Sequence, residues 1–256
     1  MAELLTSAQN PKFKRLMALR EKSRLRRDEG VFVVEGRREL EHCVEAGFEV
    51  ETVFVCRDIC NGEIIAPQVF EISKELYAKV AYREGTEGVM AIVRSRELRL
   101  DDLQLGPKPL VMVLEGVEKP GNLGAVLRSA DAAGADAVIV CDPLTDLWNP
   151  NLIRASIGAV FTVPTVCCSS AEAIAWLKAR GIRILTAQLQ DSSAYYDCDM
   201  TGPTAIVMGT EATGLTEPWR QAADAHVLIP MLGRLDSLNV SVSAAILLYE
   251  AVRQRQ

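Results

Sequence analysis

Long apolar runs are missing from this sequence of 256 residues. Its longest apolar stretches, among them AIVMG and SAAILLYEAV, are much shorter than the roughly 18 uncharged residues that span a bilayer. The first residues also lack the apolar segment of a secretory signal. We therefore expect neither a membrane role nor an exported protein.

Metal-binding patterns are missing as well. The chain has only two histidines, His42 and His226, and its seven cysteines form no CxxC pair. An odd number of cysteines without a disulfide framework favours a reducing compartment. The sequence therefore predicts a cytoplasmic protein that holds no metal ion.

Two common nucleotide-binding fingerprints are also absent. Gly121 and Gly124 do not have the spacing of a G-x-G-x-x-G loop, and no glycine-rich loop ends in Gly-Lys-Ser or Gly-Lys-Thr. A dinucleotide-dependent oxidoreductase, one alternative for a chain of this kind, is therefore disfavoured.

The formal net charge of −6 argues against a nucleic-acid partner, but the charge is unevenly distributed. Eight basic residues and a single acid, Glu21, lie between Pro11 and Arg27, in a segment whose apolar spacing predicts a helix. Such a run is either an ordinary solvated helix face or a cationic surface that attracts RNA. Both interpretations stay open at this point.

The elements predicted from hydrophobic periodicity fall into two groups. The first hundred residues alternate short strands, as over 30–36 and 50–56, with helices, as over 37–47. A polar, proline-containing segment near 96–108 then interrupts the pattern. We therefore predict an α/β chain with two domains, residues 1–99 and residues 108–256.

From Leu110 onward, apolar strands alternate regularly with helices. The strands are predicted over 110–116, 135–141, 182–189, 204–209 and 226–231. Continuous apolar strands that alternate with helices are typical of a mostly parallel sheet covered on both faces. Ligands of such sheets bind beyond the carboxyl ends of the strands, so the loops that leave the strands are the candidate sites.

The loop after the first of these strands reads PGNLGAVLRSA, from Pro120 to Ala130. Asn122 is expected to cap the following helix, because asparagine accepts a hydrogen bond from an early backbone N–H. Gly124 and Arg128 lie one turn apart, so the arginine can reach back over the glycine toward the mouth of the loop. A capped helix with a solvated arginine explains the same residues without a ligand.

Two later loops also combine glycine with polar side chains. The segment MGTEATGL carries Gly209, Glu211 and Gly214, and Glu211 is suited to hold a cation or an arginine. The segment IPMLGRLDSLNVSVSAA offers Ser237 as a helix cap, followed by Asn239 and other small polar residues. Turns and close helix packing are the simple interpretations of these loops, and ligand binding is the alternative.

Taken together and in this order, the three loops resemble the three sequence motifs of the SpoU (TrmH) family of RNA ribose 2'-O-methyltransferases, in the SPOUT class. The similarity rests on NLGA with RSA in the first loop, GTE with GL in the second, and IPM with SLNVS in the third. It covers residues 110–256 closely. More weakly, TSAQNPKFKRL and FVVEGRRE resemble the small ribosomal-protein-like domain with which many members bind substrate.

This resemblance implies properties that composition and periodicity do not. It implies a deep trefoil knot in the C-terminal parallel sheet, a homodimer, S-adenosyl-L-methionine as cofactor and RNA as methyl acceptor. The cofactor would lie against the loops at Thr186, Ala187, Gly209, Ile229 and Leu238. The catalytic set implied by the motifs is Arg128, Asn122, Glu211, Ser237 and Asn239.

The role implied for Arg128 meets a physical difficulty. Family precedent places this arginine on the ribose 2'-hydroxyl, yet a charged guanidinium has no lone pair with which to accept a proton. Either it is transiently deprotonated beside an RNA phosphate, or it stabilises the developing alkoxide while another group takes the proton, and we favour the second. Asn122 is expected to orient the arginine or the ribose, and Glu211 to fix the arginine or a loop. Ser237 and Asn239 are expected to hydrogen-bond the substrate.

The sequence leaves the acceptor open between several possibilities. A separate N-terminal domain favours ribosomal RNA over transfer RNA. A non-catalytic RNA-binding protein would bind RNA without affinity for the cofactor, and related knotted enzymes methylate base nitrogens. The prediction is therefore a cytoplasmic S-adenosylmethionine-dependent ribose methyltransferase of ribosomal RNA, with those alternatives.

Overall fold

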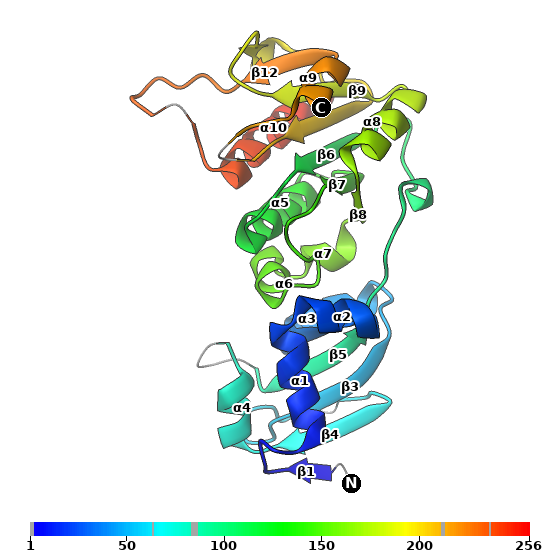
Figure 1. The fold of residues 1–256 in the computed structure, drawn as a ribbon, viewed down its shortest axis with the longest axis vertical. Helices are drawn as coiled ribbons and strands as arrows, with labels where there is room; N and C mark the ends of the chain where they lie inside the picture. The colour runs from blue at the N-terminus through cyan, green and yellow to red at the C-terminus, as the bar shows by residue number, and fades with distance from the viewer. Residues whose placement is uncertain (1–2, 63, 83–86, 211–212, 236) are drawn as a thin grey trace. The chain divides into compact units, whose positions relative to one another are not determined.

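The computed structural model describes residues 3–62, 64–82, 87–210, 213–235 and 237–256. The chain divides into two compact units. The N-terminal unit is Met1–Arg96 together with Asp146–Thr162, and the C-terminal unit is Glu97–Thr145 together with Val163–Gln256. Each unit has its own sheet (Figure 1). Across the described ranges, no helix has the length and apolar character needed to cross a membrane.

The N-terminal unit contains a five-stranded mixed sheet in the order β1-β4-β3-β5-β2. Its strands are β1 (Glu3–Leu5), β2 (Val31–Glu35), β3 (Val50–Val55), β4 (Gln68–Ile72) and β5 (Val89–Arg94). The helices of residues 1–96 are α1 (Pro11–Glu21), α2 (Ser23–Glu29), α3 (Arg37–Glu45) and α4 (Lys74–Val80). Helix α1 buries Phe13, Leu16 and Leu19, which recur at helical spacing and pack into the core of this unit.

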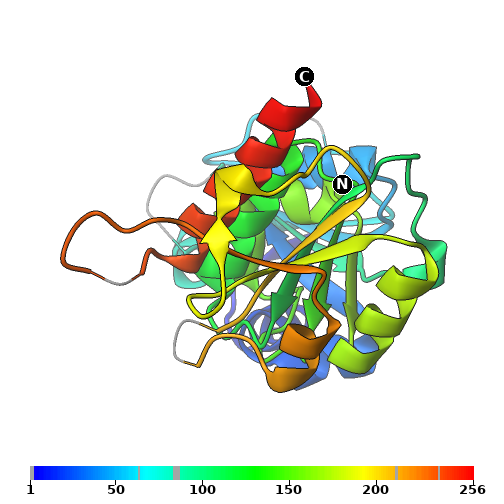
Figure 2. The same ribbon diagram turned by 90° about the horizontal axis from the view of Figure 1, so that it is seen from above.

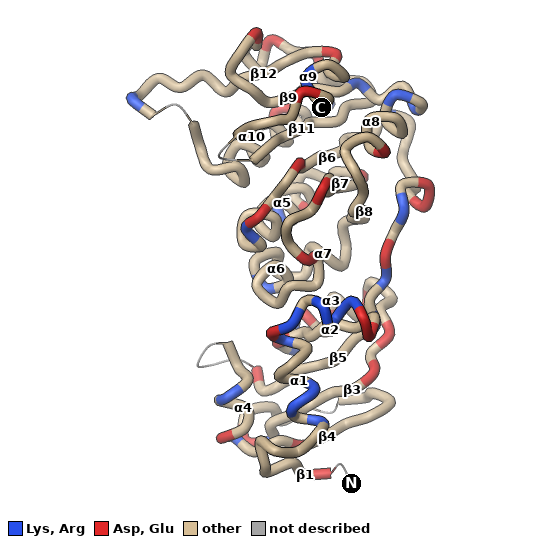
Figure 3. Tube along the Cα trace, viewed as in Figure 1, with Lys and Arg blue, Asp and Glu red and all other residues tan. Residues whose placement is uncertain are grey.

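The basic segment predicted as one helix is two helices, so that prediction was wrong. Lys22 adopts an extended conformation between α1 and α2 and ends the first helix. Lys and Arg are concentrated along α2 in Figure 3, with acids at its end. Several of these basic side chains form ion pairs, including Lys12 with Glu3 and Arg15 with both Glu29 and Glu51. The run is therefore less open to a polyanion than its composition indicates.

The segment Asp146–Thr162 packs with the N-terminal unit, although the sequence analysis places it in the domain 108–256. It forms α6 (Pro150–Ser156) and α7 (Ala159–Thr162). Trp148 stacks on Phe32, with ring centroids 4.4 Å apart. Phe161 meets Phe48 edge to face at 5.4 Å. Apolar burial of four aromatic rings holds this segment on β2 and its neighbours.

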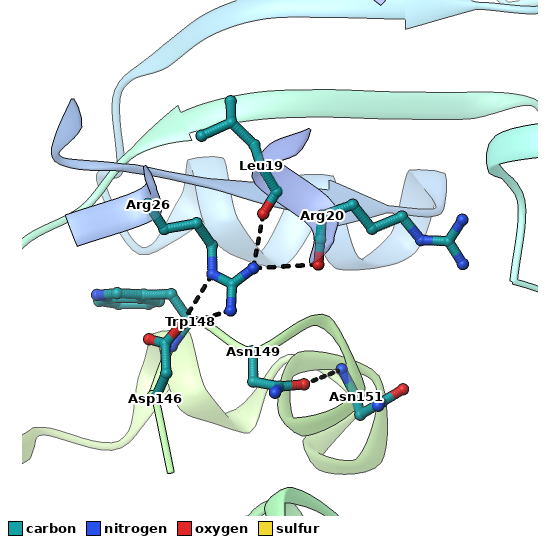
Figure 4. A network of polar contacts seen from close by, with 7 residues as sticks. All are labelled: Leu19, Arg20, Arg26, Asp146, Trp148, Asn149 and Asn151. Carbon is teal, nitrogen blue, oxygen red and sulfur yellow. Dashed lines mark hydrogen bonds and ion pairs between the residues drawn. The ribbon is translucent and has the colours of Figure 1, made fainter. Parts of the chain in front are cut away.

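A buried ion pair lies beside this aromatic cluster (Figure 4). The guanidinium of Arg26 donates from Nη2 to Asp146 Oδ2 over 2.6 Å, and the two side chains are 2% and 11% exposed. Arg26 Nη1 also donates to the carbonyl oxygen of Leu19 over 2.6 Å. The other carboxylate oxygen, Asp146 Oδ1, accepts from the backbone N–H of Trp148. Arg26, one of the eight basic residues counted between Pro11 and Arg27, is therefore a structural residue.

The C-terminal unit contains a seven-stranded parallel sheet in the order β10-β12-β9-β11-β6-β7-β8, which confirms the predicted parallel α/β architecture. Its strands are β6 (Leu110–Glu115), β7 (Ala137–Cys141), β8 (Thr165–Cys168), β9 (Arg183–Ala187), β10 (Ser193–Ala194), β11 (Thr204–Met208) and β12 (Ala225–Leu228). The central strands are buried along their whole length, as a sheet covered on both faces requires.

Helices cover both faces of this sheet. They are α5 (Pro120–Ala132), α8 (Ser170–Ala179), α9 (Glu217–Ala222) and α10 (Val240–Arg255), with short 3-10 turns η1 (Leu100–Asp102) and η2 (Tyr195–Asp197). Figure 2 shows α5 and α10 side by side on one face and α8 with α9 on the other. Alternate residues of each strand face the two layers, and the loops that leave the carboxyl ends of the strands lie at one edge of the sheet.

Candidate active site

The carboxyl ends of four neighbouring strands form the candidate site in the C-terminal unit. Because β12, β9, β11 and β6 are adjacent and parallel, their carboxyl ends meet at one edge of the sheet. Thr186 and Ala187 end β9, Gly209 follows β11, and Ile229 follows β12. The topology thus brings together four of the five residues predicted to hold the cofactor.

Gly209 stands where the loop after β11 folds back on its own backbone. Thr210 and Gly214 exchange backbone hydrogen bonds of 3.2 and 3.0 Å, which closes this loop. A Cβ at position 209 would lie 2.2 Å from the carbonyl carbon of Gly214, closer than real Cβ atoms come to backbone. A neighbouring strand end is less tight, since a Cβ on Gly116 would lie 2.9 Å from Cγ2 of Thr210. Glycine is therefore a steric requirement at position 209.

We expect Gly209→Ala to displace this loop and to destabilise the C-terminal unit by about 1–3 kcal/mol, the usual cost of overpacking. Chemical denaturation of the full chain measures the free energy of unfolding. Gly202→Ala is the matched control, because a Cβ there meets nothing within 4 Å. Equal stability of the two variants would contradict the steric account.

The side chain of Thr186 is already hydrogen-bonded to a residue of the neighbouring strand. It is fully buried, and its Oγ1 lies 2.6 Å from Nδ1 of His226 on the adjacent strand β12. Ala187 and Ile229 are half-buried and apolar. The edge therefore offers a ligand main-chain groups and aliphatic carbon from these strands, with the Thr186 hydroxyl already bonded.

The first and third sequence motifs meet through a pair of asparagines. Asn239 Nδ2 donates to Asn122 Oδ1 over 3.2 Å, which joins the first turn of α5 to the start of α10. The Oδ1 of Asn239 accepts from the backbone N–H of Ser241 at 3.0 Å and from its hydroxyl at 2.6 Å. Both asparagines predicted at the site are thus held in defined orientations.

Two predicted helix caps were wrong. Helix α5 begins at Pro120, with Lys119 in the capping position, so Asn122 lies inside the first turn. Proline suits the first helical position because its φ is already helical and it has no N–H to leave unbonded. Helix α10 is capped by Asn239, two residues after Ser237. Ser237 is exposed in the loop before the helix.

Two further predicted residues, Arg128 and Leu238, are not joined to this asparagine pair by a hydrogen bond between described residues. Arg128 is exposed on α5, and it forms no hydrogen bond or ion pair with any residue that the structure describes. Leu238 is 39% exposed in the loop that precedes α10. Glu211 lies outside the described residues. The structure thus joins Asn122 to Asn239 and gathers the strand ends, while the guanidinium of Arg128 is exposed and has no partner among the described residues.

A buried carboxylate that the sequence analysis missed ties two of these loops together. Glu115, the last residue of β6, accepts hydrogen bonds from the backbone N–H of Thr216 at 2.8 Å and from its hydroxyl at 2.6 Å. Ser170 Oγ lies 3.1 Å from the same carboxylate and accepts from Nε1 of Trp219 at 2.9 Å. These bonds hold the segment after the second motif against the strand that leads to the first. An acid at the end of an otherwise apolar strand was the available signal.

Comparisons with known proteins agree with this geometry. Residues 109–249 match the model of the SpoU rRNA methylase family, and residues 10–91 match an MRM3-like substrate binding domain. A 23S rRNA (uridine(2479)-2'-O)-methyltransferase of Streptomyces viridochromogenes is 31% identical, over 97% of this chain and 92% of that protein.

Solved structures resemble the whole chain as well. The crystal structure of an RNA 2'-O ribose methyltransferase is 40% identical, with a TM-score of 0.87 over 98% of this chain and 99% of that one. The AdoMet-bound rRNA methyltransferase of Sinorhizobium meliloti is 28% identical, with a TM-score of 0.89 over 98% of each chain. The family match spans more than half of the sequence and contains all three motif loops. The chain therefore belongs to the SpoU rRNA methylase family.

Proposed function

We propose that this protein transfers a methyl group from S-adenosylmethionine to a ribose 2'-hydroxyl of ribosomal RNA. The observation that carries the proposal is the meeting of the motif loops at one edge of the parallel sheet, with Asn122 bonded to Asn239. Similar proteins support the acceptor, since the Streptomyces viridochromogenes relative is named for 2'-O-methylation of 23S rRNA. A similar structure contains AdoMet, which supports the cofactor.

The residues at the sheet edge suit that cofactor. Ala187 and Ile229 supply half-buried aliphatic carbon beside main-chain donors and acceptors at the strand ends. Such a lining can hold an adenosine, because its ring is flat and apolar while its edge needs only a few directed hydrogen bonds. When bound, S-adenosylmethionine supplies an electrophilic methyl group on a sulfonium. Main-chain groups near Gly209, Thr186 and Leu238 complete the proposed cofactor site.

The chain's own residues then have to position and polarise the ribose. Methyl transfer requires the 2'-oxygen to be held about 3 Å from the methyl carbon and in line with the bond that breaks. We assign this positioning to Asn122 and Asn239, with Ser237 in the same loop. Arg128 stabilises the negative charge that develops on the 2'-oxygen, and a separate group accepts the proton, because a charged guanidinium cannot. Glu211 is assigned to fixing the arginine or its loop.

Several further properties belong to the same proposal. The domain 1–99 would bind the RNA, through a ribosomal-protein-like fold, and the domain 108–256 would carry the cofactor in a deep trefoil knot. The protein would act in the cytoplasm as a homodimer. Exposed apolar side chains of the C-terminal unit support the dimer, among them Leu232, which is 98% exposed, Leu235 and Val242.

The asparagine pair gives a specific test of the positioning role. We expect Asn122→Ala and Asn239→Ala each to lower kcat/KM about tenfold, which corresponds to about 1.4 kcal/mol. The double variant should lose less than the product of the two single losses, because both replacements break the same hydrogen bond. Transfer of labelled methyl from S-adenosylmethionine to ribosomal RNA measures this, with exposed Gln221→Ala as the control. Losses that multiply would show that the two asparagines act independently.

A further inference from the structure

A cavity in the N-terminal unit is separate from the residues of the proposed methyl-transfer site. Its volume is about 230 Å³, below the roughly 300 Å³ at which sites for drug-sized ligands begin. Residues of α1, β2, α3 and α6 line it, together with Tyr82 and Glu87 from the segment between α4 and β5. The lining residues used below include Arg20, Glu35, Arg38, Tyr82, Glu87 and Arg154.

One wall of the cavity is a stacked pair. The guanidinium carbon of Arg154 lies 3.4 Å from the centroid of the Tyr82 ring, and the tyrosine is 49% exposed. Arg154 Nη2 also donates a hydrogen bond to Asn151 Oδ1, in the same helix α6, over 3.3 Å. A flat cation laid on an aromatic ring is a surface on which another planar group can stack.

The end of the cavity carries a carboxylate in a fixed place. Glu35, the last residue of β2, accepts a hydrogen bond from the backbone N–H of Tyr82 at 2.8 Å. Its partial burial raises the pKa of the carboxyl group, while that N–H bond and the charges of Arg20 and Arg154 lower it. A half-buried carboxylate of this kind favours a partner that supplies N–H donors.

The cavity carries further charges, among them Glu39, which also raises the pKa of Glu35. Glu87 is occupied at the start of α3, where its Oε2 accepts from the backbone N–H groups of Arg37 and Arg38. Arg20 donates from Nη1 to the carbonyl oxygen of Val80. The side chain of Arg38 is exposed at the cavity. Cations beside a planar stacking surface suit a ligand in which phosphates flank a ring.

We propose that this cavity binds one unpaired guanine of the RNA, stacked on the Arg154–Tyr82 pair, with its Watson–Crick edge on the Glu35 carboxylate. Proteins recognise single-stranded RNA by stacking bases on aromatic or arginine planes and hydrogen-bonding their edges. Guanine presents two adjacent N–H donors on that edge, whereas the other three bases present one donor site there. Arg20 and Arg38 meet the neighbouring phosphates. The proposal rests on the proposed function only in taking RNA as the substrate.

The test uses the full chain and two RNA stem–loops that differ at one loop position, guanine in one and adenine in the other. Fluorescence anisotropy at fixed salt measures both dissociation constants, since affinity for RNA depends on salt. We expect the guanine loop to bind about tenfold more tightly, within the roughly 1–3 kcal/mol that a bidentate base contact discriminates. Glu35→Gln should remove most of this preference, while Glu45→Gln, an equal change of charge on an exposed part of α3, should keep it.

The stacking surface is tested separately. Tyr82→Ala should weaken the binding of both RNA stem–loops about tenfold, as loss of a base–aromatic stack does. Tyr82→Phe should leave both dissociation constants nearly unchanged, because it keeps the ring. Arg154→Lys keeps the charge but loses the planar stack, so it serves as a second variant should Glu35→Gln fail to fold. Equal binding of the two loops by the unaltered protein, or weak binding of both, would overturn the proposal. So would release of the guanine loop by millimolar inorganic phosphate alone, which would identify an anion site.

Methyl transfer to ribosomal RNA, measured on the same preparations, separates this proposal from the proposed function. A protein that methylates ribosomal RNA but shows no guanine preference retains the function and loses the guanine site. A protein that prefers the guanine loop but binds no S-adenosylmethionine retains the site and loses the function.

Discussion

Arg128→Ala is expected to lower kcat for methyl transfer by about 10²–10³-fold, the usual effect of removing one group that stabilises a developing oxyanion. The dissociation constant for S-adenosylmethionine should change less than about twofold, because Arg128 is not among the strand-end residues proposed to hold the cofactor. Single-turnover transfer to ribosomal RNA measures the rate, and calorimetry measures cofactor binding. The kcat of Arg128→Lys should lie between those of the unaltered protein and Arg128→Ala, since lysine retains the charge but not the planar donor fork.

Arg180→Ala provides the control for this experiment. Arg180 is also a surface arginine of the C-terminal unit, at the end of α8, and it pairs with Asp101 away from the strand ends. The Arg180→Ala variant should transfer methyl groups at the normal rate. Near-normal turnover by Arg128→Ala would remove the arginine from the mechanism. A loss that disappeared at high RNA concentration would assign it to RNA binding alone.

Arg26→Met is expected to destabilise the N-terminal unit by about 3–5 kcal/mol, because it leaves the carboxylate of Asp146 buried without its partner. The same replacement removes the donor to the carbonyl oxygen of Leu19. Adding Asp146→Asn should restore part of the lost stability, since the amide is neutral and keeps an oxygen for the backbone N–H of Trp148. Chemical denaturation followed by tryptophan fluorescence reports the free energy of unfolding.

An exposed ion pair serves as the comparison. Arg24 and Asp28 lie four residues apart on α2 in solvent, so Arg24→Met should leave the unfolding midpoint nearly unchanged. If Arg26→Met behaved like Arg24→Met, the buried pair would carry no structural role. The segment 146–162 would then be held on the N-terminal unit by its aromatic side chains alone.

The regular part of the fold could be predicted from local patterns. Strands such as LVMVLE and TAIVM are apolar except for one terminal polar residue and are buried along their whole length, so their pattern indicates a parallel sheet. β8, with the sequence TVCC, was not predicted, because four residues with two cysteines give too short a signal. The helix boundary at Asn122 was misplaced because Pro120 already starts the helix at its first position, and the one at Ser237 because Asn239 takes the cap instead.

The candidate site could be predicted only in part. The motif loops were found because the three of them, in this order, resemble the motifs of one family, whereas each loop alone also fits an ordinary turn. The bond between Asn122 and Asn239 joins residues 117 positions apart, and no local pattern reports such a contact. Nor could composition separate Arg26 from the exposed cations around it, because its burial depends on Asp146 far along the chain. Contacts between residues far apart in the sequence therefore decide which polar side chains are structural and which meet at the site.

The most direct test of the central claim is to map the methyl group itself. Purified protein is incubated with labelled S-adenosylmethionine and with ribosomal RNA or transfer RNA, and the modified nucleotides are located by mass spectrometry. The account predicts a single ribose 2'-O-methyl group in ribosomal RNA, absent when Arg128→Ala replaces the unaltered protein. Label on a base nitrogen, label in transfer RNA alone, or no transfer by a protein that binds RNA would contradict it.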